Sequence, residues 1–544
     1  MLFKQVTEAD VRQVLNDRIS KLRETQHPSV PKALAIPYES AYDRDFEIPK
    51  FQLPDEGIQA RDAYRLIHDE LDFDGQPTLN LATFVHTFME DEVTQLMMEN
   101  VNKNLADADE YPALVDIHAR CVSMIANLWN APLINGKSTG FGTSTIGSSE
   151  AVILGGLVMK KQWQLKRKSK GLDFSKPNII MGANAQVALE KFARYFDVEA
   201  RMVPVNEKSR HCLDITQLES QVDENTIGVF VILGSTYTGN FENVKEVSKK
   251  LDEIQAKTGL DVPIHVDAAS GGMIAPFAFP DLEWDFRVPR VKSINTSGHK
   301  YGMVYPGLGF IIWRSREWVP DDLIFKLHYL GGTELTYTLN FSRPGSQVIA
   351  QYYNFIRYGF QGYKQVAETD LFHARLLSFC LEASGYFRCL SDIHRQRGSY
   401  AFDPSKAVYS KATEFYNAGL PVVSFCLIDD YKKEHPYVRQ DDISRLLRMK
   451  GWIVPNYPLP PNENKTEILR VVVRNTLSRN LVDRLVHDIL DAVEYLEKEA
   501  DEKAFIHPQI SVSAEKQHSS LGAIGGNNDP EHRSGAKGAF SYTC

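Results

Sequence analysis

The chain has 544 residues, of which 43% are hydrophobic and 24% are charged, and its formal net charge at pH 7 is −9. This composition is typical of a globular protein with enough apolar residues to bury a sizeable core. A negative net charge without a basic block argues against nucleic acid and anionic membrane surfaces as main partners. An aromatic content of 10% excludes a chain that is disordered throughout.

The sequence shows no membrane segment and no targeting signal. The best apolar run, residues 151–159, ends at two lysines and is well short of the ~20 residues that a membrane-spanning helix needs. The first residues lack the apolar stretch of a signal peptide. The six cysteines are scattered without the spacing of a metal or redox site. We therefore expect a reduced, cytoplasmic protein without a metal.

Residues 1–78 do not have the pattern of an independent domain. Thr7 and Asp10 form a possible capping box, and apolar residues follow at helical spacing as far as Leu22. Residues 26–58 are rich in proline and contain no long apolar run. A helix followed by an extended strap cannot bury its apolar stripe alone, so we expect an arm that packs on a partner subunit.

Residues 79–370 alternate between helical and β-rich stretches. The helical stretches cover residues 91–104, 111–128 and 150–165, and the strand-like runs cover residues 178–181, 227–233, 262–266 and 309–313. Short apolar strands separated by segments that contain helices are typical of βαβ units and a mainly parallel sheet. The sequence therefore predicts a large α/β domain whose ligands bind beyond the carboxyl ends of the strands.

Residues 371–500 have the pattern of a smaller α+β domain. Its predicted strands cover residues 421–427 and 468–473, and its predicted helices cover residues 441–450 and 478–498. Residues 501–544 are expected to form a disordered tail, because most of this segment is rich in Gly and Ser and has little apolar surface.

Two residues near predicted strand ends favour a particular cofactor chemistry. Asp267 follows the buried run 262–266, where a carboxylate needs a partner because the burial of an isolated charge is costly. On its own, such an aspartate is more simply a helix cap or a structural hydrogen-bond acceptor. Lys300 follows a Ser-Gly-His turn further along the chain. Pyridoxal 5′-phosphate requires both a lysine that forms a Schiff base and an aspartate that keeps the pyridine nitrogen protonated.

A phosphate site is the third requirement of this cofactor. Gly147, Ser148 and Ser149 precede and open the predicted helix 150–165, where backbone N–H groups and two hydroxyls can bind an anion. Simple capping by serine explains this segment equally well when it is taken alone. Because three separate segments each supply one part of the same site, coincidence is a poor explanation.

These segments also carry a family resemblance. The sequence His-Val-Asp-Ala-Ala-Ser-Gly-Gly at residues 265–272, followed by Ser-Gly-His-Lys at 297–300, resembles the group II pyridoxal-dependent decarboxylases, and within them the glutamate decarboxylases of plants, fungi and bacteria. Supporting strings occur at residues 80–84, 104–112, 147–150, 191–195, 236–240, 340–344 and 469–474. The resemblance covers residues from about 60 to 500, by these motifs together.

The resemblance implies fold type I of the pyridoxal enzymes, the aspartate-aminotransferase-like fold, with a seven-stranded sheet and active sites shared in a homodimer or homohexamer. It makes Lys300 the Schiff-base lysine and Asp267 the partner of the pyridinium. It assigns the remaining cofactor contacts as follows: Ser148, Ser149, Ser297 and His299 to the phosphate, Ser342 of a neighbouring subunit to the same phosphate, Gln186 to the ring and Thr236 to the 3′-oxygen.

The resemblance also implies a substrate pocket. Arg470 matches the arginine that binds the α-carboxylate of the substrate. Thr83, Phe84 and Asp107 match the pocket for the distal carboxylate of L-glutamate, which is expected to be completed from across the subunit interface. The proton that returns to Cα is expected from Lys300 or from Tyr329.

The expected reaction is the α-decarboxylation of L-glutamate to 4-aminobutanoate and CO2. Two alternatives remain open from the sequence: a related pyridoxal-dependent decarboxylase or lyase with another substrate, and a non-catalytic paralogue. Residues 501–544 contain neither a Trp nor a basic amphipathic helix, so calmodulin binding is not expected.

Overall fold

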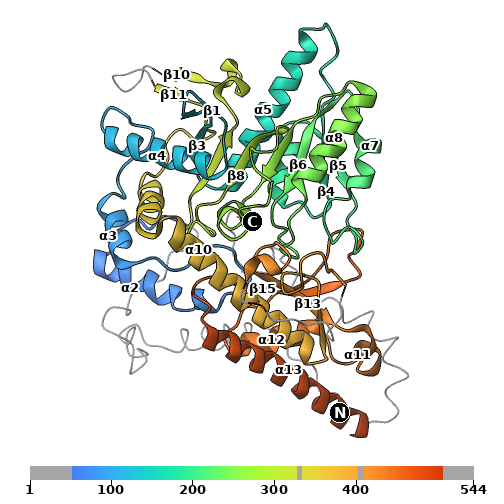
Figure 1. The fold of residues 1–544 in the computed structure, drawn as a ribbon. Coiled ribbons are helices and arrows are strands. Elements are labelled where there is room, and N and C mark those ends of the chain that lie inside the picture. Colours follow the sequence, from blue (N-terminus) through green and yellow to red (C-terminus); the bar gives the residue numbers. More distant parts are fainter. Residues whose placement is uncertain (1–51, 328–333, 402–409, 411, 507–544) are drawn as a thin grey trace. The chain divides into compact units, whose positions relative to one another are not determined.

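The computed structural model describes residues 52–327, 334–401, 410 and 412–506 (Figure 1). The chain divides into two compact units, one formed by residues 1–74 with 509–544 and the other by residues 75–508. The described part of the first unit contains α2 (Ala60–Leu71), which places Tyr64, Ile67 and Leu71 at the spacing of one helix face. The predicted helix that begins near Thr7 and most of the predicted tail lie outside the described residues.

The second unit contains a seven-stranded sheet with the order β3-β9-β8-β7-β6-β4-β5. The strands are β3 (Phe141–Thr145), β9 (Gly309–Trp313), β8 (Val291–Thr296), β7 (Ile264–Asp267), β6 (Thr226–Ile232), β4 (Asn178–Gly182) and β5 (Glu199–Val203). β9 is antiparallel to both of its neighbours, and the other neighbouring pairs are parallel. The predicted mainly parallel sheet and the α/β fold class are confirmed.

Both faces of the central strands are covered. All residues of β4, β6, β7 and β9 are buried, and buried strands of this kind are typical of a sheet with helices on both faces. β7 begins two residues later than the predicted run 262–266, after Pro263, which has no N–H for the ladder.

Helices pack against this sheet (Figure 1). The helices of the sheet region are α3 (Asp91–Glu99), α4 (Pro112–Leu128), α5 (Ser148–Lys168), α6 (Val187–Tyr195), α7 (Leu218–Gln221), α8 (Val244–Thr258) and α9 (Ala275–Ala278). α3 is shorter than the predicted helix 91–104, because the side chain of Asn100 donates to the carbonyl of Leu96 at 2.8 Å and ends the helix. α5 contacts β3, β6, β7, β8 and β9, so one helix crosses most of the sheet.

A second, antiparallel sheet has the order β12-β13-β15-β14. Its strands are β12 (Phe387–Cys389), β13 (Val422–Leu427), β15 (Glu467–Val472) and β14 (Asn456–Pro458), and its helices are α11 (Asp429–Glu434), α12 (Gln440–Met449) and α13 (Arg479–Ile506). Two hairpins, β1 (Leu133–Ile134) with β2 (Lys137–Ser138) and β10 (Phe325–Leu327) with β11 (Glu334–Thr336), complete the strands. α13 continues to Ile506, into the segment that the sequence analysis assigned to the tail.

α10 (Ser346–Ala383) links the two sheets. It contacts α3, α4 and α9 beside the large sheet, and α13, β12 and β13 of the smaller one. Gly359 interrupts it with φ 56° and ψ −171°, a conformation that favours glycine. The expected domain limit after residue 370 lies inside this helix, so the domain limits stay predictions. Among the described helices, none combines the length and apolar character needed to cross a bilayer.

Close packing at α5 depends on a glycine. A Cβ placed on Gly156 would lie 2.6 Å from Cζ of Phe192 in α6, nearer than real Cβ contacts allow. We expect Gly156→Val to lower the free energy of unfolding by about 1–3 kcal/mol through overpacking. Urea unfolding monitored by circular dichroism would measure this change. The control is Lys166→Ala on the exposed part of α5, and equal stability of the two variants would contradict the prediction.

Candidate active site

The predicted site residues meet at one edge of the large sheet. Asp267 is the last residue of β7, Thr236 follows β6, and Lys300 follows β8. Because β3 and β8 are both antiparallel to β9, β3 runs in the same direction as β8 and delivers Ser148 to the same edge. This is the carboxyl edge, where open α/β sheets bind their ligands.

Asp267 is 6% exposed and is held through one oxygen. Its Oδ1 accepts hydrogen bonds from the backbone N–H of Ala269 at 3.1 Å and from Nδ2 of Asn295 at 2.9 Å. Within the described part of the chain, Oδ2 has no such partner, so it is available to a ligand. A carboxylate in this position can hold a protonated ring nitrogen, as a pyridoxal cofactor requires.

Lys300 lies in an environment that favours the neutral amine. Burial lowers the pKa of Lys300, Arg470 adds to the shift, and Asp267 opposes it. The Nζ atom is 5.5 Å from the centroid of the Phe84 ring. An amine with a lowered pKa is a better nucleophile at neutral pH, which is the property that a Schiff-base lysine needs.

The residues predicted to bind the phosphate gather at the N-terminus of α5. The Oγ atoms of Ser148 and Ser297 are 2.7 Å apart. Ser148 is the first residue of α5 and Ser149 the second, and Gly147 precedes them without a Cβ. A Cβ on Gly147 would lie 3.2 Å from the His299 ring, so the glycine keeps open a space lined by these side chains. Backbone N–H groups at a helix N-terminus favour an anion here.

His299 is neutral in this site. Its Nδ1 accepts a hydrogen bond from the Leu308 N–H at 3.2 Å, so the neutral ring carries its proton on Nε2. Burial, together with the charge of Lys300, lowers the pKa of His299 to about 4. The ring can therefore donate one hydrogen bond to a ligand without adding a charge.

Arg470 closes the other side of the site. Its Nη1 donates to the carbonyl of Thr236 at 2.7 Å and its Nη2 donates to the carbonyl of Ala82. Its Nε is buried and has no hydrogen-bond partner among the described residues. The guanidinium Cζ lies 5.1 Å from the centroid of the Phe84 ring, and Nζ of Lys300 lies 5.5 Å from the same centroid. A buried donor without a partner fits an arginine that is built to bind a carboxylate.

Phe84 lies close to Lys300 and Arg470 of its own chain, with Nζ and Cζ 5.5 and 5.1 Å from the centroid of its ring. Its segment is bound beside the smaller sheet: Leu81 pairs with Ile453 and with Val472 through backbone hydrogen bonds of 3.0 and 2.9 Å. The expected pocket for the distal carboxylate, completed from across the subunit interface, stays a prediction.

Residues 80–87, which include Phe84, are called the pocket segment below. Arg474, to which the sequence analysis assigned no role, holds this segment in place. It is 2% exposed. Its guanidinium donates to the carbonyl of Val85, to the carbonyl of Asn80 at 2.7 Å and to Oγ1 of Thr87 at 3.3 Å. A cation that directly follows an apolar strand is the sequence signal that could have identified it, because a buried charge needs several partners.

Other predicted site residues have local partners in the described chain. Oε1 of Gln186 accepts from the Ala188 N–H at 2.7 Å and caps α6. Oγ1 of Thr83 accepts from the Val85 N–H at 3.1 Å. Oδ1 of Asp107 accepts from the Glu110 N–H at 3.0 Å, and exposed Ser342 accepts from Nδ2 of Asn104 at 3.2 Å. Their roles towards cofactor and substrate stay predictions, and Tyr329 lies outside the described residues.

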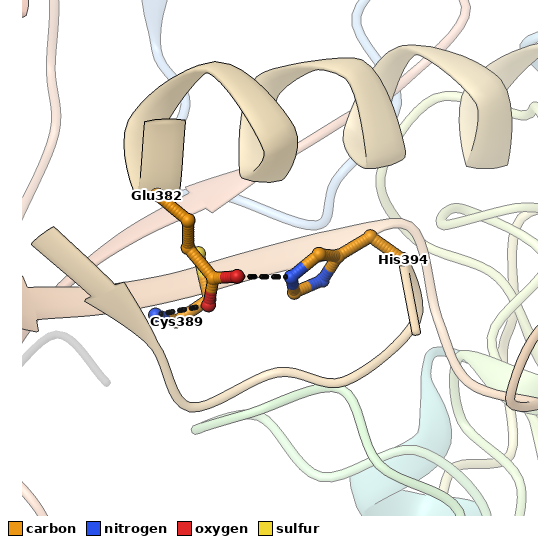
Figure 2. Close-up of side chains that lie close together, drawn as sticks. All are labelled: Glu382, Cys389 and His394. Atoms are coloured by element: carbon orange, nitrogen blue, oxygen red, sulfur yellow. Dashed lines mark hydrogen bonds and ion pairs between the residues drawn. The ribbon is translucent and has the colours of Figure 1, made fainter. Parts of the chain in front are cut away.

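A second cluster of titratable side chains lies in the smaller domain and has a structural explanation. Figure 2 shows Glu382 between Cys389 and His394. The Glu382 carboxylate accepts from the Cys389 N–H, from Nε2 of His394 and from Arg395, each at 2.9 Å. Burial raises the pKa of the Cys389 thiol, so the thiol stays protonated. The carboxylate thus holds the turn after β12 in place.

Comparison with known proteins identifies the class. The family model described as the pyridoxal-dependent decarboxylase conserved domain matches residues 54–402. The chain belongs to this family, whose cofactor is pyridoxal phosphate.

Its relatives are more specific. It is 48% identical over 459 residues to a glutamate decarboxylase of Saccharomyces cerevisiae, an alignment that covers 81% of this chain and 78% of the relative. It is 48% identical over 452 residues to a glutamate decarboxylase of Petunia hybrida, with 83% and 84% covered. A solved structure of Lactobacillus brevis glutamate decarboxylase superposes with a TM-score of 0.75 at 40% identity, covering 84% of this chain and 97% of that chain. The fold-type-I prediction is confirmed.

The proposed role of Arg474 in holding the pocket segment can be tested by mutation. We expect Arg474→Met to raise the KM for substrate more than it changes kcat, because the carbonyls of Asn80 and Val85 lose a charged donor and Phe84 is no longer held. Each hydrogen bond to a charged group contributes about 1.5–3 kcal/mol, so a KM increase of about tenfold or more is expected. Steady-state kinetics would measure the effect. Arg474→Lys should recover part of it, and an unchanged KM in Arg474→Met would contradict the role.

The burial of His86 predicts a pH dependence of stability. Burial, and to a smaller extent Arg474, lowers the pKa of His86 to about 4 from an ordinary value of 6.5. As the pH falls below 6.5, the unfolded chain takes up a proton before the folded chain does, so folding loses up to about 3 kcal/mol by pH 4. We expect His86→Gln to remove this part of the acid sensitivity. Urea unfolding of both proteins at pH 7 and 4.5 measures it, and parallel losses would contradict it.

Proposed function

We propose that this chain catalyses the α-decarboxylation of L-glutamate to 4-aminobutanoate and CO2, with uptake of one proton. The observation that carries the proposal is the arrangement of Lys300, Phe84 and Arg470, in which the lysine Nζ and the guanidinium of an arginine with an unpartnered Nε lie 5.5 and 5.1 Å from the centroid of one aromatic ring. Glutamate decarboxylases of a yeast and a flowering plant share 48% of their aligned residues with this chain.

The described residues fit the cofactor. Lys300 supplies the amine that joins it, and Oδ2 of Asp267 supplies the acceptor for its ring nitrogen. Ser148, Ser149, Ser297 and the Nε2–H of His299 supply donors for its phosphate at the N-terminus of α5. When bound, pyridoxal phosphate withdraws the electron pair that the departing CO2 leaves behind.

The protein's own contribution is to orient the substrate and to manage protons. Arg470 binds the α-carboxylate, so the bond to be broken has a fixed direction. Burial lowers the pKa of Lys300, and the amine is placed to give or accept a proton at the reacting carbon. Asp267 is held by an amide and a backbone N–H, both of them neutral donors, so no fixed cation of the chain pairs with its carboxylate through these hydrogen bonds.

The distal carboxylate distinguishes glutamate from other amino acids. In this proposal it binds at the pocket segment, beside Thr83 and Phe84, and Asp107 of another subunit completes the pocket. Asp107 and Ser342, which are both proposed to act in a neighbouring site, lie on paired segments: Asn104 bridges to Pro344, and the Leu105 N–H donates to the Arg343 carbonyl at 2.8 Å. One surface can therefore present both residues to one partner, which supports a homodimer or a homohexamer.

The proposed setting of the enzyme is the cytoplasm, without nucleic acid, membrane or calmodulin as a partner. A net charge of −9 without a basic block supports this setting.

Purified protein tests the proposal directly. We expect an absorbance band of bound cofactor, release of 4-aminobutanoate from L-glutamate and none of the corresponding amine from L-tyrosine. Lys300→Ala should lose the lysine-linked band and reduce turnover by about a thousandfold or more, since both the attachment point and a proton-transfer group are gone. The control is Lys292→Ala, which removes a lysine from the opposite end of β8. Equal use of tyrosine would support the alternative substrate class, and full activity of Lys300→Ala would refute the site.

A further inference from the structure

A chain of buried hydrogen bonds runs behind Asp267. Nδ2 of Asn295 donates to Oδ1 of Asp267 at 2.9 Å, and Oδ1 of Asn295 accepts from Nε2 of His265 at 2.8 Å. The other ring nitrogen of His265, Nδ1, lies 2.7 Å from Oγ of Ser293. The parallel pairing of β7 with β8 sets these residues opposite each other, His265 against Ser293 and Asp267 against Asn295.

The direction of each hydrogen bond in this chain is determined. An ionised carboxylate only accepts, so the amide NH2 of Asn295 must face Asp267 and its carbonyl must face His265. His265 therefore carries a proton on Nε2. Burial lowers the pKa of His265 to about 4, against the opposing effects of Asp267 and Asn295, so Nδ1 accepts from the Ser293 hydroxyl. The chain ends in a neutral ring.

The residues packed around the His265 side chain confine its ring to one position. The residues His265, Ser293 and Asn295 are all 0% exposed. The ring packs edge to face on Phe230 at a centroid distance of 5.2 Å. A Cβ on Gly155 of α5 would lie 2.6 Å from the ring, so the backbone of α5 is in contact with its other side. A side chain held in this way can transmit its position to the next member of the chain.

We propose that Asn295 and His265 are positioning residues for Asp267. They hold Oδ1 and so leave Oδ2 for the ring nitrogen of the cofactor, and they do this with neutral groups, so the negative charge that favours a protonated ring nitrogen is preserved. A cation in place of Asn295 would hold the carboxylate equally well but would compete with the ring nitrogen for its charge. This inference rests on the pyridoxal cofactor of the proposed function and not on the identity of the substrate.

The test compares cofactor affinity with stability. Asn295→Ala removes the donor to Asp267, His265→Phe keeps a ring but removes the donor to Asn295, and His265→Gln keeps a donor near the position of Nε2. The matched control is Asn178→Ala in β4, since Asn178 is also 0% exposed, donates to Asp223 at 2.8 Å and accepts from Thr226 at 2.8 Å. The apoprotein of each variant is titrated with pyridoxal phosphate, its Tm is measured without the cofactor, and kcat and KM are measured with it.

We expect Asn295→Ala to raise the Kd for pyridoxal phosphate by about tenfold or more, the effect of one lost hydrogen bond to a charged group. His265→Phe should raise it by a smaller factor, and His265→Gln should keep it within about twofold of the wild type. The kcat should fall in the same order, with KM for glutamate unchanged, because neither residue faces Arg470 or the pocket segment. Asn178→Ala should lower the Tm of the apoprotein and leave the Kd as it is.

Two results would overturn the inference. One is a Kd of Asn295→Ala that equals that of Asn178→Ala at a similar loss of Tm, because Asn295 would then be structural only. The other is equal behaviour of His265→Phe and His265→Gln. A wild-type protein that binds pyridoxal phosphate without decarboxylating glutamate would refute the proposed substrate, while the cofactor affinities would still decide the role of Asn295 and His265.

Discussion

The site depends on the electrostatic balance around one buried lysine. A charged ammonium at Lys300 is disfavoured by burial and by Arg470 and is favoured by Asp267. Opposite charges a few Å apart in a water-poor site interact far more strongly than they do in solution. Lys300, Asp267 and Arg470 therefore have to be held in fixed positions, because a small displacement of either charge would change the protonation of the amine. Most of the surrounding structure can be understood as the means of holding them.

The two arginines of the smaller domain show how this is done. Arg470 lies within β15 and Arg474 lies two residues after its end, and both donate to backbone carbonyls of residues 80–87. Carbonyl oxygens satisfy a guanidinium without cancelling its charge, which is compatible with the proposed binding of a substrate carboxylate by Arg470. Its buried Nε has no hydrogen-bond partner among the described residues, whereas a salt bridge with a local carboxylate would have used the charge internally. The pocket segment is thus held by hydrogen bonds from two guanidinium groups to its backbone carbonyls.

How much the sequence could predict depends on how far apart along the chain the interacting residues lie. Strand β9 coincides with the predicted run 309–313, and β6 differs from its predicted run by one residue at each end, because burial on both faces leaves an unbroken apolar signal. Asp267, Ser297 and Lys300 could also be predicted from the sequence, since they lie within a short stretch around two adjacent strands. Phe84 meets Arg470 because its segment is held near this arginine: the Ala82 carbonyl accepts a hydrogen bond from Arg470, 388 positions further along the chain. A pattern of neighbouring residues gives no information about a contact over such a separation.

The sequence analysis assigned no role to His265 and Asn295. Both are polar residues in buried strands, and the residue type alone does not distinguish a positioning role from a buried polar group that only satisfies its own hydrogen bonds. Only the register of β7 with β8, including its irregularity at Ile264, places Asn295 opposite Asp267. A different register would have turned the same asparagine to the other face of the sheet.

Helix α5 connects these features physically. Its first residue, Ser148, lies 2.7 Å from Ser297 at the phosphate site, and two turns further along Gly155 touches the ring of His265. The same rigid helix therefore fixes the anion site at its N-terminus and the far end of the hydrogen-bond chain that leads to Asp267. Because an α-helix resists bending over so short a length, the distance between the two ends of the cofactor site is set by the helix and not by the loops that carry the individual residues. A glycine is needed at position 155 because any larger residue would push the helix away from the histidine ring and would separate the phosphate site from the support of Asp267.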